Sequence, residues 1–404
     1  MKIDLLITNA KQIVFFENDQ LRTIENGSLA CSSGVITWFG PAEAKPEEFE
    51  PVETLKASDC IVLPGLIDSH THTVFAGSRE DEFELKLKGA TYQEIATRGG
   101  GIKNTMRATR KATRDELTAI GLERLRNAIA FGITTIEIKS GYGLSFDDEI
   151  KILEVIRSLR SLVPIDIAST FLGAHTLPPE FFENRQDYIG LICEKMIPYI
   201  AENKLAEFCD AFCEANVFSI DETRRVFETA KHHGLKLKLH ADQLTNSGGA
   251  ELCAEMGAVS ADHLETISER GIDALAKSNV VAGLLPGCSF FLRMQYPPAL
   301  KMIEAGIPIA LATDFNPGSC MTQNLQMIMS IACTQMRMSP AEVVRAVTLH
   351  AARALERNDI GNIKTGMKAD FALFRAPNYQ FIPYNFAQNH IRHVVKNGKI
   401  IFNA

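Results

Sequence analysis

Residues 132–175 read GITTIEIKSGYGLSFDDEIKILEVIRSLRSLVPIDIASTFLGAH, and the architecture follows from this stretch. It begins with a β-branched run at 132–140, continues with apolar residues at helical spacing over 147–161, and ends in a second apolar run at 165–173. Short apolar runs on either side of a helical pattern indicate two parallel strands joined by a crossover helix. The stretch therefore predicts one βαβ unit.

The same alternation continues along most of the chain. Eight strand-like runs occur, at residues 60–68, 132–140, 165–173, 206–214, 235–241, 257–263, 279–287 and 307–314. Helical patterns lie between them, at residues 115–130, 147–161, 186–203, 221–233, 247–256, 267–277 and 297–305. Eight alternating units predict an α/β fold, a closed (β/α)8 TIM-type barrel with its helices outside.

An open, doubly wound sheet is the alternative architecture. Such a sheet usually carries a glycine-rich dinucleotide turn after its first strand, and no such turn follows residues 60–68. The glycines of GGGIKNT at 99–105 follow no strand, so we expect a mobile loop there.

The two ends of the chain differ in pattern from the middle. Short strand-like runs separated by Asn, Gly and Pro fill the first 60 residues. The tail repeats this pattern, and its Asn397-Gly398 pair is a strong hairpin signal. We therefore expect a small composite β-sandwich domain from residues 1–60 and 355–404, and a barrel domain from residues 61–354.

Composition and charge narrow the classes of function. A formal net charge of −7 gives no general attraction to phosphate backbones or anionic lipid, which disfavours nucleic-acid and membrane partners. The sequence has no apolar run of about 18 residues, the length that spans a bilayer, and its start lacks the pattern of a signal peptide. The nine cysteines are scattered and never form CxxC, which favours free buried thiols in the cytoplasm.

Histidines gather at the ends of the predicted strands. The chain has ten histidines, and five of them follow strand-like runs: His70, His72, His175, His240 and His263. The carboxyl ends of barrel strands meet on one rim, where barrel enzymes place their reacting groups. Histidines that only complete hydrogen bonds in a core would account for one or two of these positions, but not for all of them.

Three of these histidines and one aspartate form a candidate metal site. Residues i and i+2 of a strand point to the same side, so His70 and His72 can face one ion. His240 and Asp314 end two other strands. Three imidazoles and one carboxylate suit zinc or iron and leave room for water. By contrast, the adjacent histidines at 232–233 lie at a helix end, and we expect them on the surface.

A metal-dependent hydrolysis would use this site. The ion would lower the pKa of a water molecule and polarise a carbonyl group. A nearby base must then take a proton and return it. His263 and Asp314 end the sixth and eighth strands of the same rim, and we expect them to carry the proton.

Eight motifs show a resemblance to a known family. PGLIDSHTH lies at the first strand, and GMKADFALF lies in the C-terminal β region. Between them the chain contains HTHTVFAGSR, IKSGYGL, FLGAHTLPPEF, LHADQL, ADHLE and TDFNPGS. The chain resembles the amidohydrolase superfamily of metal-dependent hydrolases along nearly its whole length, and within it the branch that acts in histidine degradation.

This resemblance implies a reaction, a cofactor and a set of site residues. Water would attack the ring carbonyl of 4-imidazolone-5-propanoate and open the cyclic amide C–N bond, which gives N-formimidoyl-L-glutamate. The implied cofactor is one divalent metal ion, Zn2+ or Fe2+/Fe3+, bound by His70, His72, His240 and Asp314. The residues expected to bind the substrate are Arg79, Tyr142, His175, Gln243, Asn316, Gly318 and Ser319. Among these, Arg79 offers a planar fork that suits the propionate of the substrate.

Two positions bear on how the family mechanism would work here. Gln243 stands where some members of the family have glutamate, and glutamine cannot act as a base, so proton transfer falls to His263 and Asp314. Lys139 ends the second predicted strand, whereas the carboxylated lysine of binuclear amidohydrolases comes from the fourth strand. One metal ion is therefore expected.

Two other functions remain alternatives. A mononuclear deaminase of guanine or cytosine type would share the metal ligands but would not need Arg79 or the GYG motif to hold a propionate. A non-catalytic scaffold protein on the same barrel would have lost ligands, whereas each expected strand end keeps its ligand here. The sequence does not choose between zinc and iron, and its composition allows a homodimer.

Overall fold

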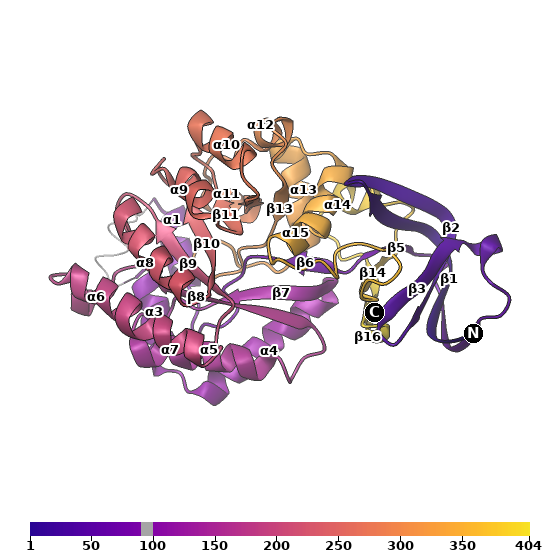
Figure 1. The fold of residues 1–404 in the computed structure, drawn as a ribbon, viewed down its shortest axis with the longest axis horizontal. Coiled ribbons are helices and arrows are strands. Elements are labelled where there is room, and N and C mark those ends of the chain that lie inside the picture. Colours follow the sequence, from indigo (N-terminus) through magenta and orange to yellow (C-terminus); the bar gives the residue numbers. More distant parts are fainter. Residues whose placement is uncertain (90–99) are drawn as a thin grey trace.

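A parallel sheet of eight strands lies inside the larger part of the molecule, surrounded by helices (Figure 1). The computed structural model describes residues 1–89 and 100–404. Neighbouring strands of this sheet follow one another in chain order, and they pair in parallel. The strands are β6 (Leu66–Asp68), β7 (Ile133–Lys139), β8 (Asp166–Ala174), β9 (Phe208–Cys213), β10 (Lys236–Ala241), β11 (Ser260–His263), β12 (Val281–Leu284) and β13 (Ile309–Leu311). The predicted (β/α)8 TIM-type barrel is confirmed.

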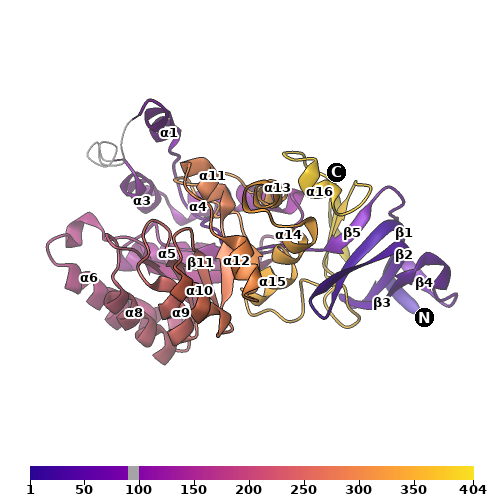
Figure 2. The same cartoon turned by 90° about the horizontal axis from the view of Figure 1, so that it is seen from above.

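Helices cover the outside of this sheet (Figures 1 and 2). The predicted helical segments correspond to α4 (Arg114–Ala130), α5 (Phe146–Leu159), α6 (Arg185–Leu191), α7 (Ile197–Glu202), α8 (Ile220–His232), α9 (Gly249–Met256), α10 (Glu269–Ala276) and α12 (Ala299–Glu304). A π-helical turn at Ile192–Met196 joins α6 to α7. Further helices are α1 (Glu80–Leu87), α3 (Ile102–Lys111), α11 (Pro286–Leu292), α13 (Leu325–Met336), α14 (Pro340–Ala346), α15 (Leu349–Arg353) and α16 (Phe381–Tyr384).

The glycine-rich stretch at 99–105 differs from the predicted mobile loop, because its second half begins helix α3. Gly101 adopts a φ of 76°, a conformation that favours glycine, and the helix starts at the next residue. Thr109 of this helix is buried, and its hydroxyl accepts a hydrogen bond from the Ala76 N–H at 3.1 Å. This contact ties α3 to the loop that follows β6. Gly99 lies outside the described residues.

The barrel closes where the first and last strands end. Thr313 donates from its backbone N–H, at 3.0 Å, and from its hydroxyl, at 2.6 Å, to the carboxylate of Asp68. One residue later, the Asp314 N–H donates to the carbonyl of His70 at 3.0 Å. The seam of the barrel therefore brings two of the predicted metal ligands side by side.

The run at 60–68, predicted as one barrel strand, forms two strands in different sheets. β5 (Ile61–Pro64) pairs with β1 and β14 of the terminal sheet, whereas β6 belongs to the barrel. Gly65 separates them, and a β-carbon at this position would lie 2.2 Å from the Thr134 hydroxyl. The close approach of Thr134 leaves room only for glycine at the crossing between the sheets.

Both ends of the chain contribute to the second sheet, as the sequence predicts. Its strands are β1 (Lys2–Glu17), β2 (Gln20–Ser32), β3 (Val35–Pro41), β4 (Glu50–Lys56), β5, β14 (Phe371–Phe374), β15 (Ile391–Lys396) and β16 (Lys399–Asn403). They form one continuous sheet in the order β16-β15-β14-β5-β1-β2-β3, with β4 paired to β1. Figure 2 shows this sheet at the end of the molecule away from the barrel helices.

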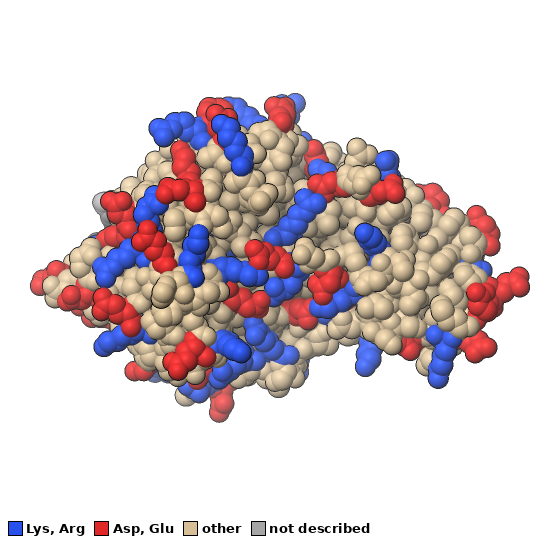
Figure 3. Space-filling model, viewed as in Figure 1, with Lys and Arg blue, Asp and Glu red and all other residues tan. Residues whose placement is uncertain are grey.

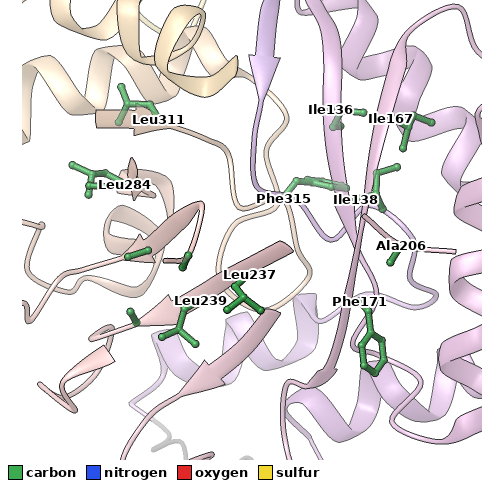
Figure 4. Packing of buried hydrophobic residues seen from close by; sticks show 14 of the residues in the cluster. Ile136, Ile138, Ile167, Phe171, Ala206, Leu237, Leu239, Leu284, Leu311 and Phe315 are labelled. Carbon is green, nitrogen blue, oxygen red and sulfur yellow. The ribbon is translucent and has the colours of Figure 1, made fainter. Parts of the chain in front are cut away.

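The barrel strands bury both of their faces. Ile136 and Ile138 of β7 belong to the main apolar core, part of which is shown in Figure 4. The residue between them, Glu137, reaches Lys238 of β10 at 3.0 Å. Because β8 and β9 separate β7 from β10 in the sheet, this ion pair crosses the barrel interior. The charged face of β7 therefore lies inside the barrel.

The surface has a mixed charge. On the face shown in Figure 3, basic and acidic side chains are interspersed. The adjacent histidines at 232–233 are exposed at the end of α8, as predicted. Across residues 1–89 and 100–404, every helix falls short of the length and apolarity that crossing a bilayer requires.

Candidate metal centre and active site

Five predicted site residues converge at the carboxyl ends of four strands. His70 and His72 follow β6, His240 lies in β10, His263 ends β11 and Asp314 follows β13. None of these five side-chain positions is more than 3% exposed. The ring centroid of His70 lies 4.5 Å from that of His240 and 5.7 Å from that of His263. The fold thus gathers residues that are far apart in the sequence.

The nitrogens and the carboxylate have the spacing of a metal site. One imidazole nitrogen from each of His70, His72 and His240 lies within 4.8 Å of the other two. Asp314 Oδ1 lies 3.6 Å from Nε2 of His70 and 3.6 Å from Nε2 of His72. A tetrahedral zinc ion with bonds of about 2.0–2.1 Å holds its ligand atoms roughly 3.4 Å apart. These four side chains therefore fit such an ion.

Two buried carboxylates orient the histidines. His70 Nδ1 lies 2.7 Å from Asp262 Oδ2, and His240 Nδ1 lies 3.1 Å from Asp210 Oδ2. An ionised carboxylate only accepts hydrogen bonds, so Nδ1 of each ring carries the proton and donates it. Within the described residues, Nε2 of His70 and Nε2 of His240 have no hydrogen-bond partner. Each of these nitrogens therefore has a lone pair available for a metal ion.

Burial favours the neutral form of these imidazoles. It lowers the pKa of His70 and of His72 well below the usual value, and the charges of Lys139 near His70 and of His175 near His72 add to the effect. Burial also lowers the pKa of His175 to about 3. Neutral imidazole is the form that binds a metal ion, so proton competition is weak at neutral pH.

A network of buried charges lies next to the histidines. Lys139 Nζ is 3.0 Å from Glu137 Oε1, 2.8 Å from Asp210 Oδ2 and 3.7 Å from Asp262 Oδ2. Burial would lower the pKa of Lys139, but Asp210, Glu137 and Asp262 raise it. Burial would raise the pKa of Asp210, but His240 and Lys139 hold it well below its usual value. Lys139 therefore serves as the counter-ion of the carboxylates that orient the histidines.

Two site residues have an unusual backbone conformation. His263 adopts a φ of 80° and Asp314 a φ of 52°, in the left-handed region that residues other than glycine rarely occupy. Strain of this kind concentrates at functional sites. Burial would lower the pKa of His263, but the carboxylate of Glu265 outweighs this effect, so the pKa is raised. Glu265 Oε1 lies 3.5 Å from His263 Nδ1. Burial raises the pKa of Asp314. Raised pKa values of this kind are common at groups that exchange protons in enzymes.

Arg79 lies against a loop that adjoins Asp314. Its Nε donates to Glu82 Oε2 at 2.8 Å, and its side chain is 10% exposed. A β-carbon on Gly318 would lie 2.3 Å from Arg79 Nη1, so the guanidinium rests directly on the turn at 316–319. Glu82 Oε1 also accepts a hydrogen bond from the Gly101 N–H at 2.9 Å. Glu82 thus fixes Arg79 and the start of α3 together.

Tyr142 and His175 lie beside His72. The His175 ring stacks on the His72 ring at 5.3 Å between centroids, and the Tyr142 centroid lies 5.3 Å from that of His175. His175 Nδ1 donates to the Gly141 carbonyl at 2.9 Å. The buried carboxylate of Glu149 accepts from the Gly141 N–H at 3.0 Å. Two hydrogen bonds therefore hold this loop in place next to the metal centre.

The loop after β10 carries Gln243. Its Nε2 donates to Cys288 Sγ at 3.3 Å. The preceding residue, Asp242, accepts from the Ser247 N–H at 2.9 Å and from the next N–H groups at the start of α9. Asp242 is therefore a helix cap, and Gln243 connects this loop to α11 through Cys288.

The turn at 316–319 is held by its own side chains. Asn316 Oδ1 accepts from the N–H groups of Gly318, at 2.8 Å, and Ser319, at 2.9 Å, as in an Asx-type turn. The Ser319 hydroxyl donates to Asp314 Oδ2 at 3.2 Å. In this structure the two N–H groups therefore serve the turn itself, and the hydroxyl supports Asp314.

Three buried acidic residues belong to the site although sequence reasoning assigned them no role. They are Asp210, Asp262 and Glu149. A signal for the first two was present, because each is the one carboxylate of a short strand, in FCDAFC and SADH. A charge in a buried strand needs a partner, and the partners here are the histidines and Lys139. Glu149 lies in a helix pattern and gave no comparable signal.

Comparisons with known proteins agree with this fold. A sequence model of the amidohydrolase family matches residues 97–402. The solved structure of an adenosine deaminase from Xanthomonas campestris with bound zinc has a TM-score of 0.74, at 18% identity, over 99% of this chain and 93% of that one. The chain belongs to the amidohydrolase family, and it is a metal-dependent hydrolase.

Curated relatives within this family share one name. The imidazolonepropionase of Alkaliphilus oremlandii is 48% identical over 99% of this chain and 98% of its own length. That of Fusobacterium nucleatum is 47% identical over 100% of both chains. At this identity and coverage, the chain groups with the imidazolonepropionases.

Proposed function

We propose that the chain hydrolyses 4-imidazolone-5-propanoate to N-formimidoyl-L-glutamate, the imidazolonepropionase reaction of histidine degradation. Water adds to the ring carbonyl and the cyclic amide C–N bond breaks. The carbonyl carbon becomes a carboxylate, and the ring nitrogen leaves with a proton. The relatives' name supports this reaction. The observation that carries it here is Arg79, placed on the turn that supports Asp314.

Four side chains would hold the cofactor. We assign His70, His72, His240 and Asp314 as the ligands of one divalent metal ion, Zn2+ or iron, because their ligand atoms converge and, in the part of the chain that the structure describes, two of the nitrogens have no hydrogen bond. When bound, this ion would lower the pKa of a water molecule and polarise the ring carbonyl. The ion pairs of Lys139 support a single ion, since they leave its amine no freedom to bridge a second one.

His263 and Asp314 are the groups that would move the proton. Together with His70 they offer ligand atoms that all lie within 4.8 Å of one another. One of them takes a proton from water as it adds to the carbonyl, and the proton is returned to the ring nitrogen as the C–N bond opens. Gln243 has no basic group, so we assign it to hydrogen bonding with the substrate.

The remaining predicted residues would position the substrate. Arg79 has its Nε occupied by Glu82, which leaves the terminal nitrogens of the guanidinium for the propionate. Tyr142 and His175 would contact the flat polar ring, since both rings lie beside His72. Asn316, Gly318 and Ser319 would act through the turn, by shaping the surface on which Arg79 rests.

An assay with freshly prepared 4-imidazolone-5-propanoate tests this function. The metal-loaded protein is expected to form N-formimidoyl-L-glutamate, detected directly by mass spectrometry, and to lose this activity when a chelator removes the ion. Cytosine and guanine serve as comparison substrates. Release of ammonia from either of them, with no N-formimidoyl-L-glutamate formed, would instead support the deaminase alternative.

Arg79→Ala is expected to lower kcat/KM for this substrate by roughly 10- to 100-fold. The variant loses hydrogen bonds between a guanidinium and a carboxylate, which contribute roughly 1.5–3 kcal/mol. Arg79→Lys should recover little of the lost kcat/KM, because an ammonium group cannot reproduce the planar fork of the guanidinium. The matched control is Arg114→Ala, which removes a surface arginine paired with Glu154. Steady-state kinetics on the three variants measure these effects. Equal kcat/KM values for Arg79→Ala and the control would show that Arg79 does not bind the substrate.

We infer a cytoplasmic location from the cysteines. All nine are free, and eight of them are buried. Free thiols in this number are typical of a reducing compartment. The location agrees with a substrate that arises in histidine degradation.

A further inference from the structure

A second group of metal-binding side chains lies beside the candidate metal centre. His263, Glu265 and Cys288 each offer one ligand atom, and these atoms all lie within 4.8 Å of one another. The three residues are at most 3% exposed. None of them belongs to the four proposed ligands of the catalytic ion. The group therefore needs an explanation of its own.

Two polar atoms of this group lack a hydrogen bond. Across residues 1–89 and 100–404, His263 Nδ1 and Glu265 Oε2 are buried without a hydrogen bond. The other oxygen of Glu265, Oε1, lies 3.5 Å from His263 Nδ1 and accepts a long hydrogen bond from the Ser289 hydroxyl at 3.3 Å. Buried polar atoms are nearly always satisfied, because an unmade hydrogen bond in the protein interior destabilises the fold. Because the ligand atoms of the three residues converge, these unsatisfied atoms point to a ligand there.

The chemistry of the three groups selects a class of ion. Imidazole, carboxylate and thiolate together suit Zn2+ and similar divalent transition metals, whereas Mg2+ and Ca2+ prefer oxygen ligands. The thiol of Cys288 now accepts a hydrogen bond from Gln243. On binding, the S–H bond would break, the sulfur–metal bond would form, and the proton would pass to solvent.

We propose that His263, Glu265 and Cys288 form an inhibitory site for a second divalent transition-metal ion of the Zn2+ class. The proposal rests on the proposed function, because it assigns proton transfer to His263. An imidazole that coordinates the second ion can no longer exchange a proton with water and substrate. Excess metal therefore stops turnover without displacing the catalytic ion. This site has only three ligands, and one of them must first lose a proton. We therefore expect it to bind the ion more weakly than the catalytic site does, and to fill only when the ion is in excess.

The test uses protein that already holds one equivalent of metal ion, verified by elemental analysis. Cd2+ is then titrated in while the near-ultraviolet absorption of cadmium–thiolate bonds is recorded, and turnover is measured across the same series with Zn2+. We expect one further equivalent to bind with a thiolate band, and activity to fall with it. Cys288→Ser should lose the band and should need at least tenfold more Zn2+ for half-inhibition, because serine keeps the acceptor for Gln243 but binds zinc poorly.

Two further cysteine variants serve as controls for this titration. Cys288→Ala is a second variant in case serine disturbs folding, and Cys333→Ser changes the one cysteine that is not fully buried. A band that survives both Cys288 variants, or that disappears with Cys333→Ser, would overturn the site. The absorption band does not depend on turnover, so a protein that binds Cd2+ in this way but fails to hydrolyse 4-imidazolone-5-propanoate would refute the proposed function alone.

Discussion

We expect Asp314→Asn to lower kcat by roughly 10²–10⁴-fold and to reduce the metal content of the purified protein. Asp314 Oδ1 lies at equal distances from two imidazole nitrogens of the candidate centre, 3.6 Å in each case. The substitution removes an anionic ligand and, together with it, one of the two groups proposed to carry the proton. Loss of a positioned acid–base group alone costs a factor in this range. Elemental analysis and steady-state kinetics measure the two effects separately.

The matched control is Asp242→Asn, because Asp242 is also buried and also follows a barrel strand. Its carboxylate caps α9 rather than facing the histidines. This control should lower the free energy of unfolding by about 1 kcal/mol, the usual value of a helix cap, and should keep the metal and most of the activity. An Asp314→Asn protein with a full equivalent of metal and a kcat within tenfold of the unchanged chain would show that Asp314 is not a ligand.

The architecture was readable from the sequence because each element has a strong local signal. Parallel barrel strands are buried on both faces, so they appear as short continuous apolar runs, and the helices between them show the spacing of an amphipathic surface. The site was readable for a related reason. Catalytic side chains of a barrel follow its strands, so His240 could be assigned to the rim by its place after LKLKL.

The features that the sequence did not predict depend on contacts between residues that are far apart in the chain. The change of sheet at Gly65 is set by the approach of Thr134, which no local pattern reveals. Glu82 looks like one of several acidic residues in a surface helix, yet it is buried and fixes Arg79. The helix that begins after Gly101 follows glycines that predict a loop, because tertiary contacts of Thr109 outweigh the local preference.

The second large effect is expected from Lys139→Met, which should lower the free energy of unfolding by about 3–5 kcal/mol. Lys139 is completely buried and pairs with the carboxylates of Glu137 and Asp210. Methionine fills a similar volume but leaves these charges with less compensation in the barrel interior, and breaking a buried pair in this way costs about this amount. Urea denaturation of the metal-free proteins measures the difference without a contribution from ion binding.

The dependence of this loss on pH identifies its cause. In the unchanged chain the pKa of Asp210 is held low, so its ionised form stabilises the fold above the unfolded value near 3.9, and this contribution fades as the pH falls toward the lower folded value. Without Lys139 that stabilisation is reduced, so the deficit of the variant should be largest at neutral pH and should shrink on acidification. Lys301→Met, at a surface pair with Glu269, is the control and should change the free energy by less than about 1 kcal/mol at any pH. A deficit for Lys139→Met that stays constant with pH would assign the loss to packing rather than to charge.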